Sequence, residues 1–80
     1  MKYTDGTEIK LGDTVLISGQ YHGVVVADID NGRYSESNPE EQWAYLASGV
    51  MIDTDFGGLV HYQQENLVSE TIELESREGN

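Results

Sequence analysis

The chain has 80 residues, which leaves room for a single small core. Its 15 acidic and 4 basic side chains give a formal net charge of −11, beyond the magnitude of about 2–8 that is common in small soluble domains. The absence of cysteine excludes a disulfide scaffold and any cysteine-based metal or redox site, and no stretch approaches the roughly 18 apolar residues of a membrane span. The first residues lack the apolar run of a signal peptide, so we expect a cytoplasmic protein.

Short apolar runs alternate with glycine-containing turns along the whole chain, which predicts an all-β domain. We expect five strands, at Thr14–Ser18, Gly23–Asp30, Val50–Thr54, Leu59–Tyr62 and Thr71–Glu75. In the second of these, strand alternation directs Ala27 and Ile29 inward and Asp28 and Asp30 outward. The residues before Ala27 are apolar on both faces, as expected where a strand bends.

The connections between the strands differ in kind. Asn31-Gly32 is a hairpin-type turn, and the polar stretch 33–38 reads as a loop. Residues 39–46 predict a short helical turn, because Pro39 suits a first helical position and Glu40 and Glu41 suit the positive end of the helix dipole. The competing interpretation makes residues 43–46 a strand, and residues 63–68 read as a connecting turn.

The register of the hairpin formed by residues 50–62 stays open. A loop of two or four residues places Ile52 beside His61, whereas a loop of three residues places Asp53 there. A slip of one residue exchanges the two faces of a strand, so the facing of His61 depends on the loop length.

Residues 11–30 resemble a KOW-type motif, in which a Gly-Asp turn and a short strand are followed by a glycine-bearing turn and a second strand. The resemblance implies a Src-homology-3-like barrel of the kind found in ribosomal and transcription-factor modules. KOW modules that bind RNA carry lysine and arginine around the turn, but here the turn is Gly19-Gln20-Tyr21-His22-Gly23. The chain also resembles a group of small bacterial proteins of uncharacterised function, in landmarks such as Trp43 and residues 58–62, which implies a bacterial source and no activity.

We therefore predict one domain over residues 1–75, a five-stranded antiparallel Src-homology-3-like β-barrel with one short helical turn, followed by a disordered tail at 76–80. Closing the sheet would remove the exposed edges of a small open sheet. The predicted core consists of Val15, Ile17, Val25, Ala27, Ile29, Leu46, Val50, Ile52, Leu59, Ile72 and Leu74.

No pattern in the sequence supports catalysis, a metal or a cofactor. No serine lies in a Gly-x-Ser-x-Gly elbow, and the pairs Asp28/Asp30 and Asp53/Asp55 read as the solvated face of a strand. Residues 28–32 resemble the start of a calcium loop, but their glycine comes fifth, where that loop requires it sixth. We expect a protein that is not an enzyme.

The acidic balance instead favours a basic protein as partner, because an acidic surface attracts basic proteins and speeds their capture. The candidate binding residues are Tyr34, Glu36, Glu40, Glu41, Trp43 and Tyr45. An inhibitor or immunity-type protein would fit this description. Two plainer interpretations stay open: the charge maintains solubility, and Trp43 plugs one end of the barrel.

Nucleic acid and a second copy of the chain are two further candidate partners. Direct binding of nucleic acid is the function that the KOW resemblance implies, but four scattered cations among fifteen acidic residues oppose it. A homodimer is a further alternative, because so small a chain gains from burying a second face.

Overall fold

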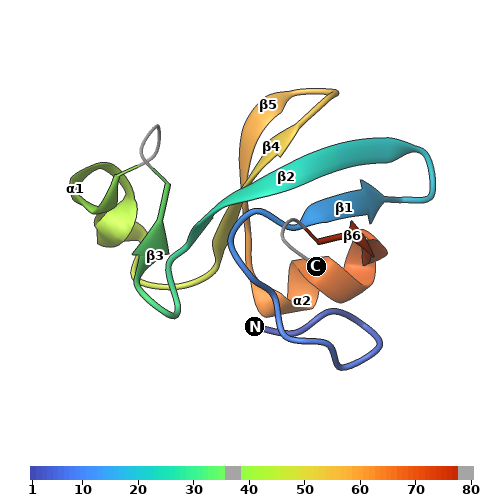
Figure 1. Cartoon of the computed structure of the whole chain (residues 1–80), viewed down its shortest axis with the longest axis horizontal. Helices are drawn as coiled ribbons and strands as arrows, with labels where there is room; N and C mark the ends of the chain where they lie inside the picture. Colours follow the sequence, from blue (N-terminus) through green and yellow to red (C-terminus); the bar gives the residue numbers. More distant parts are fainter. Residues whose placement is uncertain (36–38, 78–80) are drawn as a thin grey trace.

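The computed structural model describes residues 1–35 and 39–77 and is mostly β (Figure 1). The six strands are β1 (Thr14–Ile17), β2 (Tyr21–Asp28), β3 (Arg33–Tyr34), β4 (Val50–Thr54), β5 (Gly58–Tyr62) and β6 (Ile72–Ser76). Three short helical pieces connect them: α1 (Glu40–Trp43), the 3-10 helix η1 (Ala44–Leu46) and α2 (Gln64–Ser69). Within the described residues, no helix combines the length and the apolar character needed to cross a lipid bilayer.

The strands form one antiparallel sheet in the order β5-β4-β2-β1-β6, with β3 paired to β2. This confirms the all-β prediction. The sheet is not closed, because β5 and β6 lie at opposite ends of this order and are not paired with each other. The predicted closure into a barrel is therefore not observed.

A β-bulge in β2 divides the sheet into two regions. Val25 lies opposite Ile52 and Ala27 lies opposite Met51, so β2 contains one more residue than β4 between these pairs. An extra residue reverses the facing of every side chain beyond it. Val25 and Ala27 would share a face in a regular strand, but here they belong to two different hydrophobic clusters.

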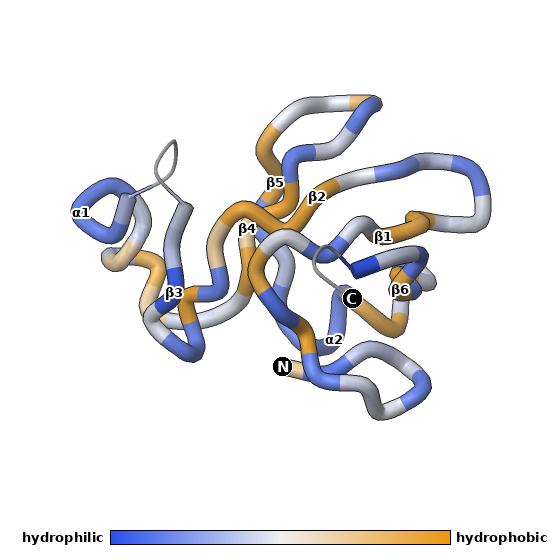
Figure 2. The backbone as a smooth tube through the Cα atoms, viewed as in Figure 1, coloured by the Kyte–Doolittle hydropathy of each residue, from blue (hydrophilic) through white to orange (hydrophobic). Residues whose placement is uncertain are grey.

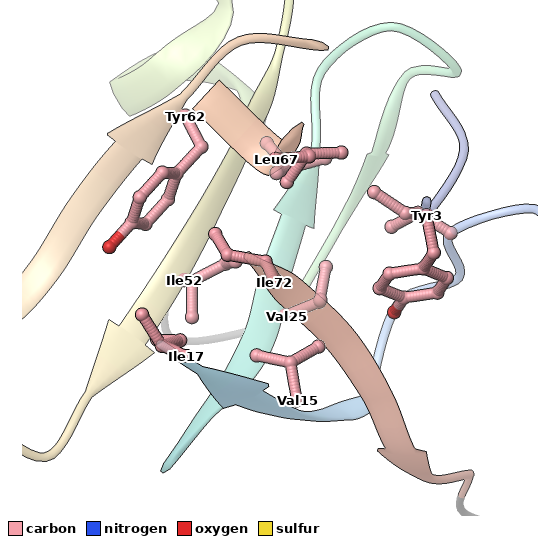
Figure 3. Close-up of a cluster of buried hydrophobic side chains, with 10 residues drawn as sticks. Tyr3, Val15, Ile17, Val25, Ile52, Tyr62, Leu67 and Ile72 are labelled. Atoms are coloured by element: carbon pink, nitrogen blue, oxygen red, sulfur yellow. The ribbon is translucent and has the colours of Figure 1, made fainter. Parts of the chain in front are cut away.

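The larger cluster lies on the inner face of the sheet (Figure 3). Leu67 reaches it from α2, and Tyr3 and Ile9 reach it from the N-terminal segment. Its buried members are Tyr3, Ile9, Val15, Ile17, Val25, Val50, Ile52, Tyr62, Leu67 and Ile72. Hydrophobic residues are concentrated along β2 where it runs beside β4 (Figure 2).

The smaller cluster lies on the opposite face, beyond the bulge, and contains Ala27, Ile29 and Met51. The segment from β3 to η1, residues 33–35 and 39–46 among those described, covers this cluster and is called the arm. Tyr34, Trp43 and Leu46 of the arm are partly buried against it.

Eight of the eleven predicted core residues are buried, and three differ. Leu46 and Leu74 are only partly buried. The prediction that Leu59 belongs to the core is wrong, because 43% of this residue is exposed. Leu59 lies opposite Asp53 on the outward face, because the hairpin loop is Asp55–Gly57 and pairs Thr54 with Gly58. The observed loop of three residues is one of the two alternatives, and it places His61 on the same side of the hairpin as Asp53. The direct partner of His61, however, is Met51 and not Asp53 or Ile52.

Asp28 was predicted to face solvent and is instead buried, with 1% of its surface exposed. The bulge is the cause, since it turns Asp28 to the side of Val50, a member of the larger cluster. Ile9 of the N-terminal segment lines a pocket with Asp28 on this side.

The connections follow the predictions in part. The helical turn predicted at 39–46 is confirmed as α1 and η1. The stretch 63–68 is a helix, α2, and not a simple turn; Gln63 and Asn66 cap its start through a reciprocal pair of hydrogen bonds. Ser76 belongs to β6 and the Arg77 side chain is hydrogen-bonded to Asp13, so these two residues of the predicted tail are part of the fold; residues 78–80 lie outside the described residues.

We predict that Val25→Asp unfolds the protein, whereas Val24→Asp does not. Val25 is 1% exposed and would bury an unpaired charge, which costs several kcal/mol, on the order of the whole stability of a small domain. Val24 is the neighbouring residue on the same strand and is 40% exposed. Thermal melts followed by circular dichroism compare the two variants, and equal melting temperatures would contradict the two-face assignment.

Candidate functional site

The residues predicted to form a binding patch lie on the arm, but they do not all face outward. Tyr34 and Trp43 pack against the smaller cluster, so their apolar surface contributes to folding. Tyr45 is 76% exposed, and Glu40 and Glu41 are exposed on α1. Glu36 lies outside the described residues. The structure thus leaves one exposed aromatic ring with two carboxylates nearby in the chain.

A second acidic surface lies on the sheet itself. It occupies the part of the outer face of the sheet that the arm does not cover. Val24 stands opposite Asp53, which stands opposite Leu59, so these three side chains form one row across β2, β4 and β5. In the next row, Leu16 lies between His22 and Glu73. We call this surface the open face; it consists of Leu16, His22, Val24, Asp53, Asp55, Leu59, Glu73 and Glu75.

His22 connects the acidic residues at one end of the open face. Its Nε2 lies 3.1 Å from Glu75 Oε2, and its Nδ1 lies 3.9 Å from Asp55 Oδ2. Its backbone N–H also donates to Asp55 Oδ2 at 3.2 Å. These contacts join β2 to β6 and to the β4–β5 hairpin, and they hold two carboxylates in place without burying them.

Tyr21 at the start of β2 and Phe56 in the β4–β5 loop form an aromatic pair. Their ring centroids are 4.8 Å apart with the planes tilted by 55°, a favourable aromatic arrangement. Both rings are exposed, and Tyr21 pairs with the core residue Ile17, so it lies on the opposite side of β2 from Val24.

A buried carboxylate, Asp13, joins the two ends of the chain. Its Oδ2 accepts hydrogen bonds from the Tyr3 hydroxyl at 2.6 Å and the Lys10 N–H at 2.9 Å. Arg77 donates from Nε to Oδ1 at 2.8 Å and from Nη2 to Oδ2 at 3.0 Å. Arg77 also donates to the Glu8 carbonyl at 2.8 Å.

The pKa shifts of this cluster follow from its contacts. Burial alone would raise the pKa of Asp13, but the hydrogen bonds from Arg77, Tyr3 and the Lys10 N–H outweigh it and lower the pKa. Burial and the bond to Asp13 raise the pKa of the Tyr3 hydroxyl, and the same carboxylate raises the pKa of Arg77. Tyr3 is therefore neutral and Asp13 ionised at ordinary pH.

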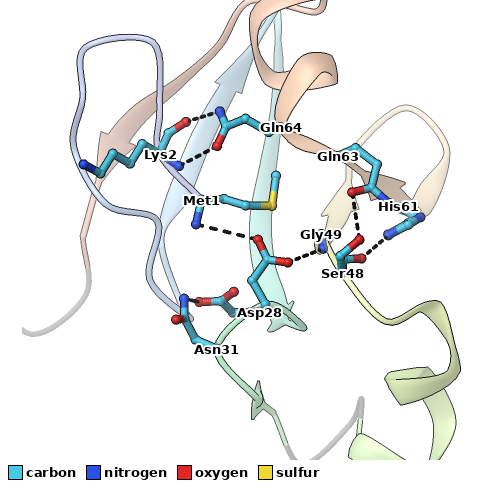
Figure 4. Close-up of polar contacts among 10 residues, drawn as sticks. Met1, Lys2, Asp28, Asn31, Ser48, Gly49, His61, Gln63 and Gln64 are labelled. Carbon is cyan, nitrogen blue, oxygen red and sulfur yellow. Dashed lines mark hydrogen bonds and ion pairs between the residues drawn. The ribbon is translucent and has the colours of Figure 1, made fainter.

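Asp28 is a second buried carboxylate and is less well satisfied. Asn31 Nδ2 donates to its Oδ2 at 2.8 Å (Figure 4). Its Oδ1 is buried and has no hydrogen-bond partner among the residues that the structure describes. It lines a pocket of about 130 Å³ together with Glu8, Ile9, Lys10, Asn31 and Arg33. The two negative and two positive side chains of this pocket balance each other in formal charge.

Polar contacts fix the segments around the sheet (Figure 4). Lys2 and Gln64 exchange two hydrogen bonds, which dock the N-terminal segment on α2. His61 Nε2 lies 2.8 Å from the Ser48 carbonyl, so Nε2 carries the proton. Gly49 lies beneath this contact, with a φ of +96°, and a Cβ there would come within 2.6 Å of His61 Nε2.

These groups do not form a metal centre, since no cluster of three histidine, aspartate or glutamate residues within 1–35 and 39–77 is arranged to hold an ion. Comparisons with family models, with curated proteins and with solved structures found no match.

Sequence reasoning missed the open face. The apolar residues Val24 and Leu59 were visible in the sequence, but Leu59 was placed in the core. Only the pairing of Asp53 with both Val24 and Leu59 places the three side chains together.

We predict that Asp13→Asn lowers the free energy of unfolding by about 2 kcal/mol at pH 7, because it weakens charge-assisted hydrogen bonds to a buried group. The folded-state pKa of Asp13 is lowered, so its contribution is fully present above the unfolded value near 4 and is lost as the pH falls through the folded value. Urea titrations of both proteins between pH 2 and 7 test this, and the difference should shrink below pH 4. A difference independent of pH would contradict the role of the ionised carboxylate.

We predict that Asp28→Asn leaves stability unchanged or raises it. The amide oxygen can still accept from Asn31, and the change removes a buried charge of which one oxygen has no donor. The same urea titration at pH 7 measures the free energy of unfolding of this variant. Asp13→Asn, the same substitution at the other buried carboxylate, is the matched control. A loss of more than about 1 kcal/mol would mean that Asp28 Oδ1 does have a partner.

Proposed function

We propose that this protein is a non-enzymatic, acidic protein-binding module that captures a basic protein, as an inhibitor or immunity-type protein would. The observation that carries the proposal is the open face, where exposed Val24 and Leu59 lie on either side of Asp53. Further carboxylates, Asp55 and Glu75 at His22 and Glu73 beside Leu16, lie on the same face. Interfaces of this kind combine an apolar centre with a polar rim.

The distribution of charge supports a basic partner. Among the described acidic residues, only Asp13 and Asp28 are buried, and the others are exposed. Arg77 is bound to the buried Asp13, so one of the four basic side chains contributes little to the surface. The outward field is therefore strongly negative, which speeds association with a basic protein and slows association with nucleic acid.

The arm is the second candidate surface. Its exposed Tyr45, close in the chain to the exposed Glu40 and Glu41, offers an aromatic contact on an acidic segment. We favour the open face over the arm, because its apolar residues belong to strands that are paired on both sides or to a hairpin. Such residues are already ordered, so binding through them loses less conformational entropy.

The finer fold assignment, a Src-homology-3-like barrel with a KOW-type hairpin, is also a proposal. Its support is the antiparallel β1–β2 hairpin formed by the KOW-like stretch, and the pairing of β1 with the last strand, β6. The tip of that hairpin, Ser18–Gln20, carries no cation, so this resemblance brings no support for RNA binding.

The test is capture from a nuclease-treated lysate with stepped salt elution and mass spectrometry. We expect one stoichiometric basic protein that salt releases. Capture should be lost with Asp53→Asn/Glu73→Gln and retained with Glu40→Gln/Glu41→Gln, which removes the same charge from the arm. Loss with the second pair alone would assign binding to the arm, and retention by both would contradict recognition through acidic residues on either surface.

A further inference from the structure

The free edge of β5 points to the way in which the partner docks. We propose that an extended segment of the basic partner, with basic and apolar residues in alternation, adds to the sheet as a strand beside β5. This inference rests on the proposed function and names the recognition element of the same open face.

β5 lies at the end of the strand order and, within the part of the chain that the structure describes, pairs only with β4, so one side of its backbone has no partner strand there. Exposed edges of this kind are usually protected by charged residues or proline. The sequence of β5 is Gly-Leu-Val-His-Tyr, which has neither. β6, at the other end of the strand order, carries Glu73 and Glu75, so the two end strands differ in protection.

The two faces of β5 define what an added strand must carry. Val60 is partly buried against the larger cluster, so a residue of the partner on that face meets the margin of the core. Leu59 is exposed on the open face with Asp53 opposite it. Successive residues of a strand face opposite sides, so the complementary segment alternates apolar and basic residues.

The geometry suits lysine or arginine at the basic positions. An added strand would lie about 4.8 Å from β5 and thus about 10 Å from β4, where Asp53 lies. A long basic side chain can cover Leu59 with its aliphatic part and direct its charge to Asp53. The ladder of main-chain hydrogen bonds would supply affinity, and the alternating side chains specificity.

A second copy of this chain is the poorer occupant of the same edge. Each copy carries a formal charge of −11, so two copies repel each other, whereas a basic segment is attracted. Charge complementarity therefore selects the basic partner over self-association.

The experiment uses two synthetic peptides with four lysines each, Lys-Val-Lys-Val-Lys-Val-Lys and Lys-Pro-Lys-Pro-Lys-Pro-Lys. Proline keeps the charge but prevents a regular ladder. We expect the valine peptide to bind at least about tenfold more tightly by titration, and to protect alternate amides of β5 from hydrogen exchange in NMR spectra.

Two variants of equal charge provide the control. Leu59→Lys places a like charge on the edge and should weaken binding of the valine peptide about tenfold relative to Val68→Lys, which changes an exposed residue of α2. Both sites are exposed, so both variants should fold.

Equal binding of the two peptides without protection of β5 would overturn strand addition, while salt-sensitive capture from lysate would still support the proposed function. Protection at β6 instead of β5, or binding of neither peptide, would also overturn it. Protection of β5 that rises with protein concentration in the absence of peptide would assign the edge to a second copy.

Discussion

The β-bulge in β2 is the constraint on which the rest of this structure depends. β2 pairs with β1, β3 and β4, so a change of facing within it affects most of the sheet. The extra residue between Val25 and Ala27 gives a small chain two hydrophobic clusters on opposite faces. One cluster is covered by α2 and the N-terminal segment, and the other by the arm. The open face is the part of the sheet that α2, the N-terminal segment and the arm all leave uncovered.

The two buried carboxylates show how differently a charge is accommodated in the same fold. Asp13 receives donors from both ends of the chain, and its bonds to Arg77 attach the residue after β6 to the segment before β1. Asp28 is buried as a consequence of the bulge and, among the described residues, has only Asn31 as a side-chain donor. The contacts of Asp13 hold the two ends of the chain together and stabilise the fold, whereas the burial of Asp28 destabilises it.

The proposed function follows from where the acidic residues lie rather than from their number. A net negative charge alone is compatible with a role in solubility. The sheet adds a specific arrangement, in which Val24 and Leu59 are exposed beside Asp53, and an edge strand lacks protection next to them. This combination of apolar contact, charge and free backbone is what a basic extended partner requires.

The sequence by itself determined the all-β class, the approximate positions of five strands, the helical turn at 39–46 and the acidic surface. These features depend on local signals: strand alternation, turn residues, helix-start residues and charge. The same signals identified Val15, Ile17, Val25 and Ile52 as core residues, and all four are buried.

Only the tertiary structure decided which side each strand residue faces beyond the bulge, why Asp28 is buried and why Leu59 is exposed. It also decided that the arm packs with Trp43 against the sheet, and that Tyr3 and Arg77 meet at Asp13. A bulge, or a shift of one residue in a hairpin register, turns the side chains of a strand to its opposite face. Contacts between distant segments are not encoded in either segment alone. For that reason the binding surface we favour became visible only once the strands were paired.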